Sequence, residues 1–198
     1  MNWHGSRVTD RCGTRVSRHW TASSTNSNDG RRLVVAGNEG EIQRTTVRRK
    51  SEREVIVTRT FDAPARLVFA AWSEPGLFRK WWVPRSMGMT LRSCEMDVRT
   101  GGSYRLVFGN GPANPMAFFG RYLEVIPHKR IVWTNEESGD TGSITTVTFE
   151  ERDGKTLLVL SELYPTKEAL DAAGTGAQDA LHETFGQLDE LLAELSAR

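Results

Sequence analysis

Residues 54–72, EVIVTRTFDAPARLVFAAW, carry the change of pattern that decides the fold. The first part, Glu54–Phe61, is rich in β-branched residues and predicts a strand. Asp62 follows as a candidate N-cap, and Pro64 is tolerated in the first turn of a helix, so a short helix is predicted to run to Trp72. One strand and one short helix therefore begin the folded part of the chain.

The segment after this helix repeats the helix start and then changes to strands. Ser73-Glu74-Pro75 predicts a second short helix that ends at about Trp82. Six further strands, each bounded by turn residues, are predicted at 89–95, 103–108, 117–126, 130–134, 143–151 and 156–164. The connections are short, and Asp153-Gly154 is a strong hairpin signal, so the strands are predicted to form an antiparallel meander.

The last part of the chain carries one apolar stripe at helical spacing. Leu181, Phe185, Leu188, Leu192 and Leu195 recur every three or four residues, which predicts a long helix. A short helical turn is predicted before it, because two glycines interrupt the pattern. A sheet and an amphipathic helix each bury one face against the other. The sequence therefore predicts an α+β domain: a seven-stranded curved antiparallel sheet around a long C-terminal helix, with two short helices after the first strand.

Residues 1–50 differ in composition from the rest of the chain. They are rich in Ser, Thr, Asn, Arg and Gly, and their apolar residues follow neither the strand period nor the helix period. They contain 10 basic and 4 acidic side chains, whereas residues 51–198 contain 16 and 21, a net charge of −5. The interpretation is a disordered basic extension followed by one folded domain at 51–198. We do not expect this domain to bind nucleic acid, because its net charge is negative and binding to the phosphate backbone depends on Lys and Arg side chains.

The remaining composition argues against several classes of protein. Two cysteines, Cys12 and Cys94, are too few for a disulfide framework or a metal knuckle. His128 and His182 have no further Cys, His or carboxylate at ligand spacing, so no metal and no cofactor are predicted. The apolar run Leu157–Leu160 is far shorter than the ~20 residues of a membrane helix. We therefore predict a cytoplasmic protein that does not enter a membrane.

The stretch KWWVP places two tryptophans side by side. On a helix, Trp81 lies four residues from Leu77 and Trp82 four residues from Phe78, so both rings can face inward together. Pro84 then ends the helix. Two interpretations stay open: the tryptophans cover the mouth of a cavity, or they pack as part of the core.

Two charged positions are candidates for contact with a polar ligand group. Arg99 lies two residues from Asp97 beside a Gly-Gly turn, so both side chains are on one side if the chain is extended. Arg99 then binds either a charged ligand group or Asp97, as an ion pair that fixes the turn. Glu162 interrupts an apolar strand. It needs a partner or a raised pKa if it points inward, and neither if it faces solvent.

Aromatic residues supply the other candidates for a cavity wall. Tyr104 and Phe108 share one face of their strand, while Phe119 and Trp133 project from later strands. Phe185 belongs to the apolar stripe of the last helix. The alternative is ordinary core packing, because the last strand is apolar on both faces and does not show which face of the sheet meets the helix.

Several stretches together resemble one family of proteins. They are TFDAP at 60–64 with VFAAW at 68–72, the two tryptophans with Pro84, DVRTGGSYR at 97–105, GRYLEV at 120–125 and LDELL at 188–192. From about residue 53 to 197 the chain resembles the activator of heat-shock protein 90 ATPase homologue-like branch of the START/polyketide-cyclase superfamily, whose fold is called helix-grip. Where many relatives have Gly-Trp in the last helix, this chain has Thr184-Phe185.

The resemblance implies an elongated hydrophobic cavity that holds a lipid-like, aromatic or polyketide-like molecule. A second implication is a co-chaperone-like module that contacts a chaperone and stimulates its ATPase. A third is a cyclase- or hydrolase-type reaction in the cavity, in which Arg99 or Glu162 moves protons. The candidate ligand-binding residues are Trp81, Trp82, Arg99, Tyr104, Phe108, Phe119, Trp133, Glu162 and Phe185.

Overall fold

The computed structural model describes residues 45–109, 115–137, 142–173 and 177–197. The strands are β1 (Thr46–Arg49), β2 (Glu54–Phe61), β3 (Thr90–Met96), β4 (Ser103–Gly109), β5 (Met116–Ile126), β6 (Arg130–Thr134), β7 (Ile144–Arg152) and β8 (Lys155–Leu163). The helices are α1 (Ala65–Ser73), α2 (Pro75–Trp81), α3 (Lys167–Ala173) and α4 (Ala177–Ser196), with a 3₁₀ turn η2 (Arg85–Met87) after α2.

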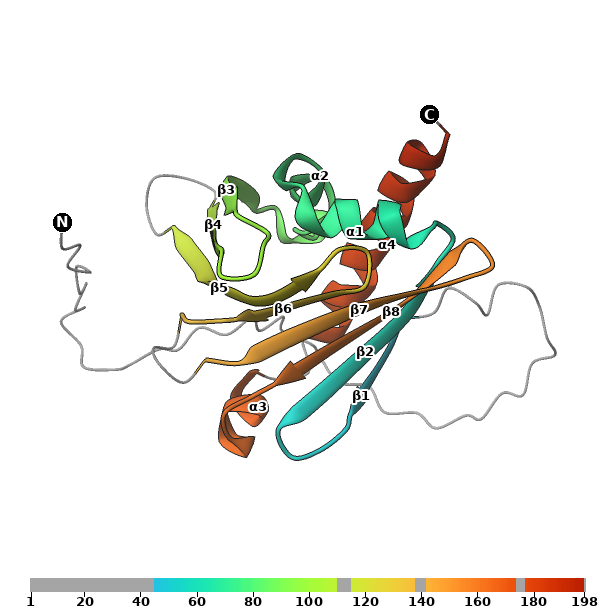
Figure 1. The fold of residues 1–198 in the computed structure, drawn as a ribbon. Helices are drawn as coiled ribbons and strands as arrows, with labels where there is room; N and C mark the ends of the chain where they lie inside the picture. The colour runs from blue at the N-terminus through green and yellow to red at the C-terminus, as the bar shows by residue number, and fades with distance from the viewer. Residues whose placement is uncertain (1–44, 110–114, 138–141, 174–176, 198) are drawn as a thin grey trace, which may run out of the picture.

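The strands form one antiparallel sheet in the order β1-β2-β8-β7-β6-β5-β4-β3. Figure 1 shows α4 crossing behind the curved sheet, with α1 and α2 beside it at the upper edge. The predicted α+β fold, with an antiparallel sheet, two short helices and a long C-terminal helix, is confirmed.

The predicted number of seven strands was wrong by one, because β1 adds an eighth strand at the edge of the sheet. This strand has only four residues, three of them polar, and only Val47 packs against the core. Its stability comes from pairing with β2, in which Val47 lies opposite Val57. A polar strand this short has no period that sequence reading could detect. The predicted extension comprised residues 1–50, and Thr46–Arg49 of this range form β1, whereas residues 1–44 lie outside the described residues.

The start of α1 also differs from the expectation. Pro64 is the N-cap residue, and Asp62, the expected cap, instead lies 3.6 Å from the Lys155 ammonium group. The carboxylate of Glu151, from β7, accepts a hydrogen bond of 2.8 Å from the Ala65 backbone N–H. A distant acidic residue therefore caps the helix, where it also meets the positive end of the helix dipole.

The core lies between one face of the sheet and the helices. One row of direct register partners on this face consists of Val57, Leu160, Val147 and Ile131. All four side chains are buried. Phe61 of β2 meets Phe185 of α4 edge to face, with ring centroids 5.6 Å apart. We call this side the helix-facing surface of the sheet, and the other side the outer face.

A partly buried ion pair links α4 to the sheet. The Arg59 guanidinium, from β2, donates a hydrogen bond to the Asp189 carboxylate of α4 and another, of 2.8 Å, to the Thr45 hydroxyl. Burial raises the pKa of Asp189, although the Arg59 charge acts in the opposite direction. Breaking this pair would leave one charge buried alone, so it holds α4 in one position.

The edge strand β3 is partly protected. Arg79 of α2 donates a hydrogen bond of 3.3 Å to the Leu91 carbonyl oxygen. The pairing of β3 with β4 also shifts register between Leu91 and Ser93. The irregular pairing and the Arg79 guanidinium both interrupt the row of free backbone groups that an edge strand presents.

Candidate functional site

An aromatic cluster centred on Trp72 lies between the short helices, α4 and the sheet. The Trp72 ring contacts five others, with centroid distances of 4.9–6.5 Å, and these belong to Trp81, Trp82, Trp133, Phe149 and Phe185. The Trp72 ring is therefore contacted by three predicted ligand-binding residues from different parts of the chain: Trp82, Trp133 and Phe185. Trp72 was not among the candidates, although it follows Val68 and Phe69 at helical spacing on the apolar face of α1.

The two adjacent tryptophans have different environments. Trp81 is fully buried, and its indole N–H donates a hydrogen bond of 2.9 Å to the Ala71 carbonyl. Trp82 is only half-buried and stacks on Phe78, with ring centroids 4.7 Å apart. Trp81 is thus part of the packed core, and Trp82 is the one that remains accessible at the end of the cluster.

Gln187 of α4 holds the KWWVP stretch in place. Its amide nitrogen donates to the carbonyl oxygens of Trp81 and Val83, at 2.7 and 2.9 Å. Its amide oxygen accepts a hydrogen bond of 2.9 Å from the Arg85 backbone N–H. A helix end leaves its last carbonyls without intrahelical donors, so Gln187 caps α2 from a neighbouring helix.

A row of polar side chains adjoins the aromatic cluster on the helix-facing surface. Trp133, Thr145 and Glu162 are direct register partners across β6, β7 and β8, and therefore point to the same side. Glu162 lies on the same face as Leu160, so the alternative in which it faces solvent from the outer side is wrong. The half-buried Glu162 carboxylate accepts a hydrogen bond of 2.7 Å from Ser143.

Asn135 connects this row to Tyr104. Its side-chain oxygen accepts hydrogen bonds from the Tyr104 hydroxyl at 2.9 Å and from the Trp133 indole N–H at 3.2 Å. Its side-chain nitrogen donates to the hydroxyls of Ser143 at 3.0 Å and Thr145 at 2.9 Å. Sequence reading did not single out Asn135, because an Asn after a strand is also a common turn residue.

The tyrosines around this network stay protonated. Burial raises the pKa of Tyr104, and the carboxylates of Glu137, Glu162 and Glu136 act in the same direction. The pKa of Tyr164 is raised by burial, then by the charge of Glu162 and a hydrogen bond to it. Both phenols are therefore neutral at physiological pH.

The other predicted residues are divided between the two faces. Phe108 lies on the helix-facing surface and meets Phe118 edge to face at 5.3 Å. Phe119 points to the outer face, with 38% of its surface exposed. Arg99 is 71% exposed and pairs with Asp97 at 2.9 Å, as in the ion-pair interpretation. The structure thus separates Phe119 and Arg99 from the aromatic and polar residues described above.

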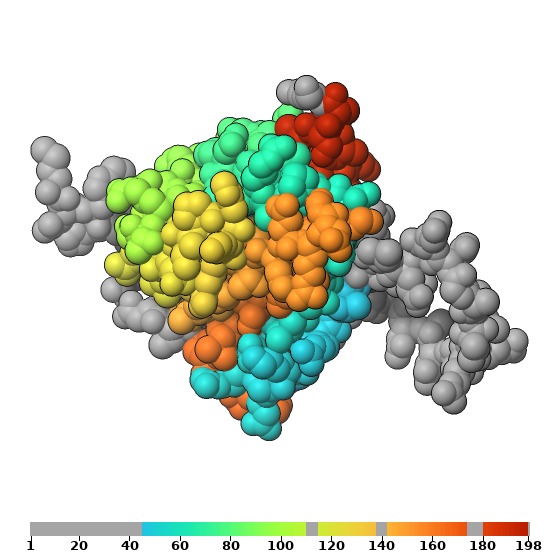
Figure 2. Space-filling view, turned by 45° about the vertical axis from the view of Figure 1, so that its right-hand side comes forward, coloured from blue at the N-terminus to red at the C-terminus, as the bar shows by residue number. Residues whose placement is uncertain are grey.

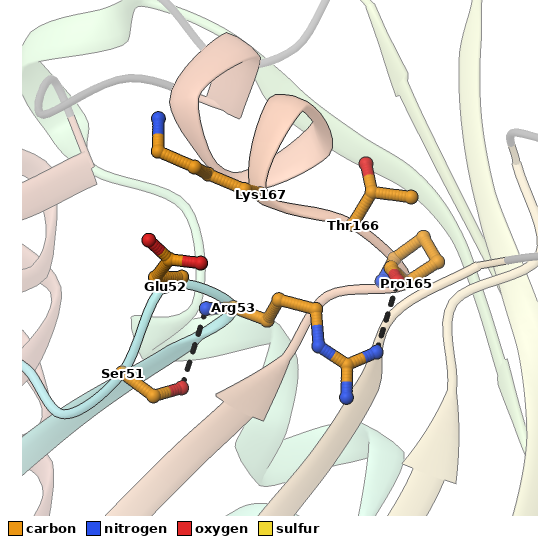
Figure 3. A pocket seen from close by; sticks show the side chains of 6 residues that line it. All are labelled: Ser51, Glu52, Arg53, Pro165, Thr166 and Lys167. Atoms are coloured by element: carbon orange, nitrogen blue, oxygen red, sulfur yellow. Dashed lines mark hydrogen bonds between the residues drawn. The ribbon is translucent and has the colours of Figure 1, made fainter.

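A separate open pocket of about 620 Å³ lies between the β1–β2 turn and the start of α3 (Figure 3). Its lining consists of Ser51, Glu52, Arg53, Pro165, Thr166 and Lys167. Figure 3 shows Arg53 bonded to the Pro165 carbonyl, at 3.0 Å. This shallow surface lacks the aromatic lining typical of small-molecule sites, so the helix-facing surface is the stronger candidate.

Among the described residues, no helix is long and apolar enough to span a bilayer.

Comparison with solved structures supports the same fold. A Rhodobacter sphaeroides protein matches with a TM-score of 0.70 and 24% identity, over 77% of this chain and 99% of that chain. A Staphylococcus epidermidis protein matches with a TM-score of 0.63 and 27% identity, over 75% of this chain and 94% of that chain. An uncharacterized protein of Schizosaccharomyces pombe is 29% identical over 140 residues, which cover 69% of this chain. The chain spans only 37% of the length of that relative.

The family comparison agrees with the geometry. Residues 62–193, from the turn before α1 to the last turns of α4, match the family described as "Activator of Hsp90 ATPase homolog 1-like protein". The matched range contains the Trp72 cluster, the Asn135 network and the helix that covers them. The chain therefore belongs to the Activator of Hsp90 ATPase homolog 1-like family.

Proposed function

We propose that this domain binds a small, largely apolar molecule between the helix-facing surface of the sheet and helices α1, α2 and α4. The observation that carries the proposal is the continuity of the aromatic cluster with the polar network. The aromatic cluster on Trp72 passes through Trp133 directly into the Asn135 network. Apolar and aromatic walls with a few oriented polar groups are typical of ligand sites.

Packing alone does not call for this arrangement. A half-buried carboxylate and a half-buried amide are no more stabilising than apolar side chains of the same volume. In addition, the Trp72 indole N–H is buried without a hydrogen-bond acceptor in the described part of the chain. An unpaired buried donor costs about 1–3 kcal/mol. An oxygen atom of a bound molecule would offset that cost.

The proposal is tested with purified protein in two steps. Native mass spectrometry would detect a hydrophobic molecule that co-purifies, and calorimetry would measure binding of 1-methylnaphthalene. Trp82→Ala removes an accessible ring of the cluster, so we expect affinity for this probe to fall at least about tenfold. Leu163→Ala, on the outer face, is the matched control and should leave it unchanged. Failure of the wild type to bind any such molecule would overturn the proposal.

A second candidate function is contact with a chaperone, which the description of the family names for its reference protein. The observation in its favour is on the outer face. Ile144 and Leu163 are direct cross-strand neighbours, 37% and 39% exposed, and Phe119 is exposed on the same face. Figure 2 shows the β5–β6 and β7–β8 segments, yellow and orange, side by side at the surface.

This second function predicts that the wild type stimulates the ATPase of an Hsp90-type chaperone. An Ile144→Ser, Leu163→Ser double variant should then lose the stimulation while it still binds 1-methylnaphthalene. No stimulation by the wild type at any concentration would exclude this function. A third alternative, a reaction in the same space, could use Glu162 to move protons but not Arg99, which lies at the surface.

A further inference from the structure

The connection between β1 and β2 carries more positive charge than its neighbours neutralise. Residues 48–53, RRKSER, contain four basic side chains and one acidic, Glu52, whereas the folded domain as a whole is acidic. Two of the four basic side chains are ion-paired with carboxylates of α3 and β2. Arg48 and Arg53 make no such pair within the part of the chain that the structure describes. An excess of positive charge at one place on the surface attracts an anion.

An accessible hydroxyl group lies in the middle of this charge. The side chain of Ser51 is exposed, and its oxygen accepts a hydrogen bond of 3.2 Å from the Arg53 backbone N–H (Figure 3). A serine hydroxyl has one proton to donate and two lone pairs, and this bond uses only one lone pair. Ser51 can therefore act as a nucleophile without losing a contact that holds the fold.

The residues before Ser51 form a pattern that protein kinases recognise. Arg48 and Arg49 precede Ser51 by three and two residues, whereas the other Arg-Arg pair of the sequence, at 31–32, is followed two residues later by Val34. Kinases with an acidic substrate groove select a serine by two arginines at these positions, because guanidinium and carboxylate groups form strong, directional pairs. Both arginines belong to β1, an edge strand, so their backbone is extended and has a neighbouring strand on one side only.

The open pocket beside Ser51 supplies cations that could hold a phosphate. Arg53 of the β1–β2 connection and Lys167 of α3 both line it (Figure 3). The Arg53 guanidinium donates to a backbone carbonyl oxygen at 3.0 Å, which leaves its charge without a counter-ion. The single carboxylate of Asp171 is shared by Lys167 and Arg49. A phosphoserine carries a charge of about −1.5 to −2 at neutral pH and three acceptor oxygens, so it matches this surplus of donors.

We propose that Ser51 is a phosphorylation site of an arginine-directed serine kinase, and that Arg53 and Lys167 hold the phosphate in the pocket. The Ser51 oxygen forms a bond to the terminal phosphorus of a nucleoside triphosphate, and the bond from this phosphorus to the bridging oxygen breaks. The hydroxyl proton passes to a base of the kinase, and the nucleoside diphosphate leaves. This site is separate from the helix-facing surface, so the proposal does not depend on the proposed function.

Phosphorylation of the purified full chain tests the first half of the proposal. With the catalytic subunit of cyclic-AMP-dependent protein kinase and MgATP, tandem mass spectrometry should find one phosphate on Ser51. In Arg48→Gln the rate at Ser51 should fall at least about tenfold, as for one lost hydrogen bond between charged groups. Arg105→Gln removes an exposed arginine of β4 and is the matched control, which should keep the wild-type rate. No phosphate on Ser51 of the wild type, or an unchanged rate in Arg48→Gln, would overturn the kinase site.

Phosphorus NMR of the phosphorylated chain tests the second half. The two cations favour the dianion, so the second pKa of the phosphate should lie below the value of about 6 for free phosphoserine. This pKa should rise toward the free value in Arg53→Gln and in Lys167→Gln. Lys129→Gln, in the exposed β5–β6 turn, is the control and should leave it unchanged. A wild-type pKa equal to that of free phosphoserine, or no change in either pocket variant, would show that the pocket does not hold the phosphate.

Discussion

Replacing Gln187 by Met should loosen the KWWVP stretch and destabilise the whole domain. The side chain is 4% exposed and makes three hydrogen bonds to backbone groups of Trp81, Val83 and Arg85. Met has nearly the same volume but cannot make them. At about 1 kcal/mol for each bond, and more where a backbone group stays buried and unpaired, the free energy of unfolding should fall by roughly 3 kcal/mol.

Urea unfolding measures this loss, and amide hydrogen exchange shows where it acts. Exchange should accelerate first at Trp82 and Arg85, while the central strands keep their protection relative to global unfolding. Glu190→Gln is the matched control, because its salt bridge with Arg85 is exposed on both sides and should contribute less than about 1 kcal/mol. A Gln187→Met protein within about 1 kcal/mol of the wild type, with unchanged exchange in this stretch, would refute the reasoning.

Three further perturbations test other parts of the structure. Gly120→Ala would place a Cβ 1.8 Å from a backbone carbonyl oxygen of β6 and should destabilise the domain by about 3 kcal/mol or more. In Gly186→Ala on α4 the added Cβ meets nothing within 4 Å, so this variant should be more stable by about 0.5–1 kcal/mol. Equal melting temperatures of the two variants would contradict this prediction. Glu151→Gln weakens the cap of α1 and should cost about 1 kcal/mol in urea unfolding, so no change would show that the cap is dispensable. Hydrogen bonds from Ser86 lower the pKa of Glu183 in the folded state, so its contribution is present above the unfolded value of roughly 4.3 and is lost as the pH falls. In Glu183→Gln the free energy of unfolding should therefore fall less steeply as the pH is lowered below about 4.3. The same pH dependence in the variant and the wild type would contradict this prediction.

Much of the fold could be predicted because its elements have strong local patterns. Strands β2 to β8 have ends within about two residues of the predicted ones, since turn residues and alternation mark both. The cap of α1 could not be predicted, because the residue that supplies it, Glu151, is far away in sequence. Local propensity favoured Asp62, and tertiary structure decided otherwise.

The candidate site was predictable only in part, for a similar reason. Strand β8 is apolar on both faces, so its pattern left the direction of Glu162 open, and register with Thr145 settled it. Phe119 was placed with the cavity wall because aromatic side chains favour burial, yet its strand alternation directs it to the outer face. Asn135 acquires its role only through partners on β4 and β7, which no local pattern reveals.

The protection of the β3 edge affects how the protein behaves at high concentration. A sheet that does not close on itself can grow by adding a strand from another molecule, the first step toward insoluble assemblies. Arg79 occupies the Leu91 carbonyl, and the register shift beside it breaks the regular ladder that an incoming strand would need. The same short helix that carries the tryptophans thus also hinders the addition of a strand from a neighbouring copy at the β3 edge.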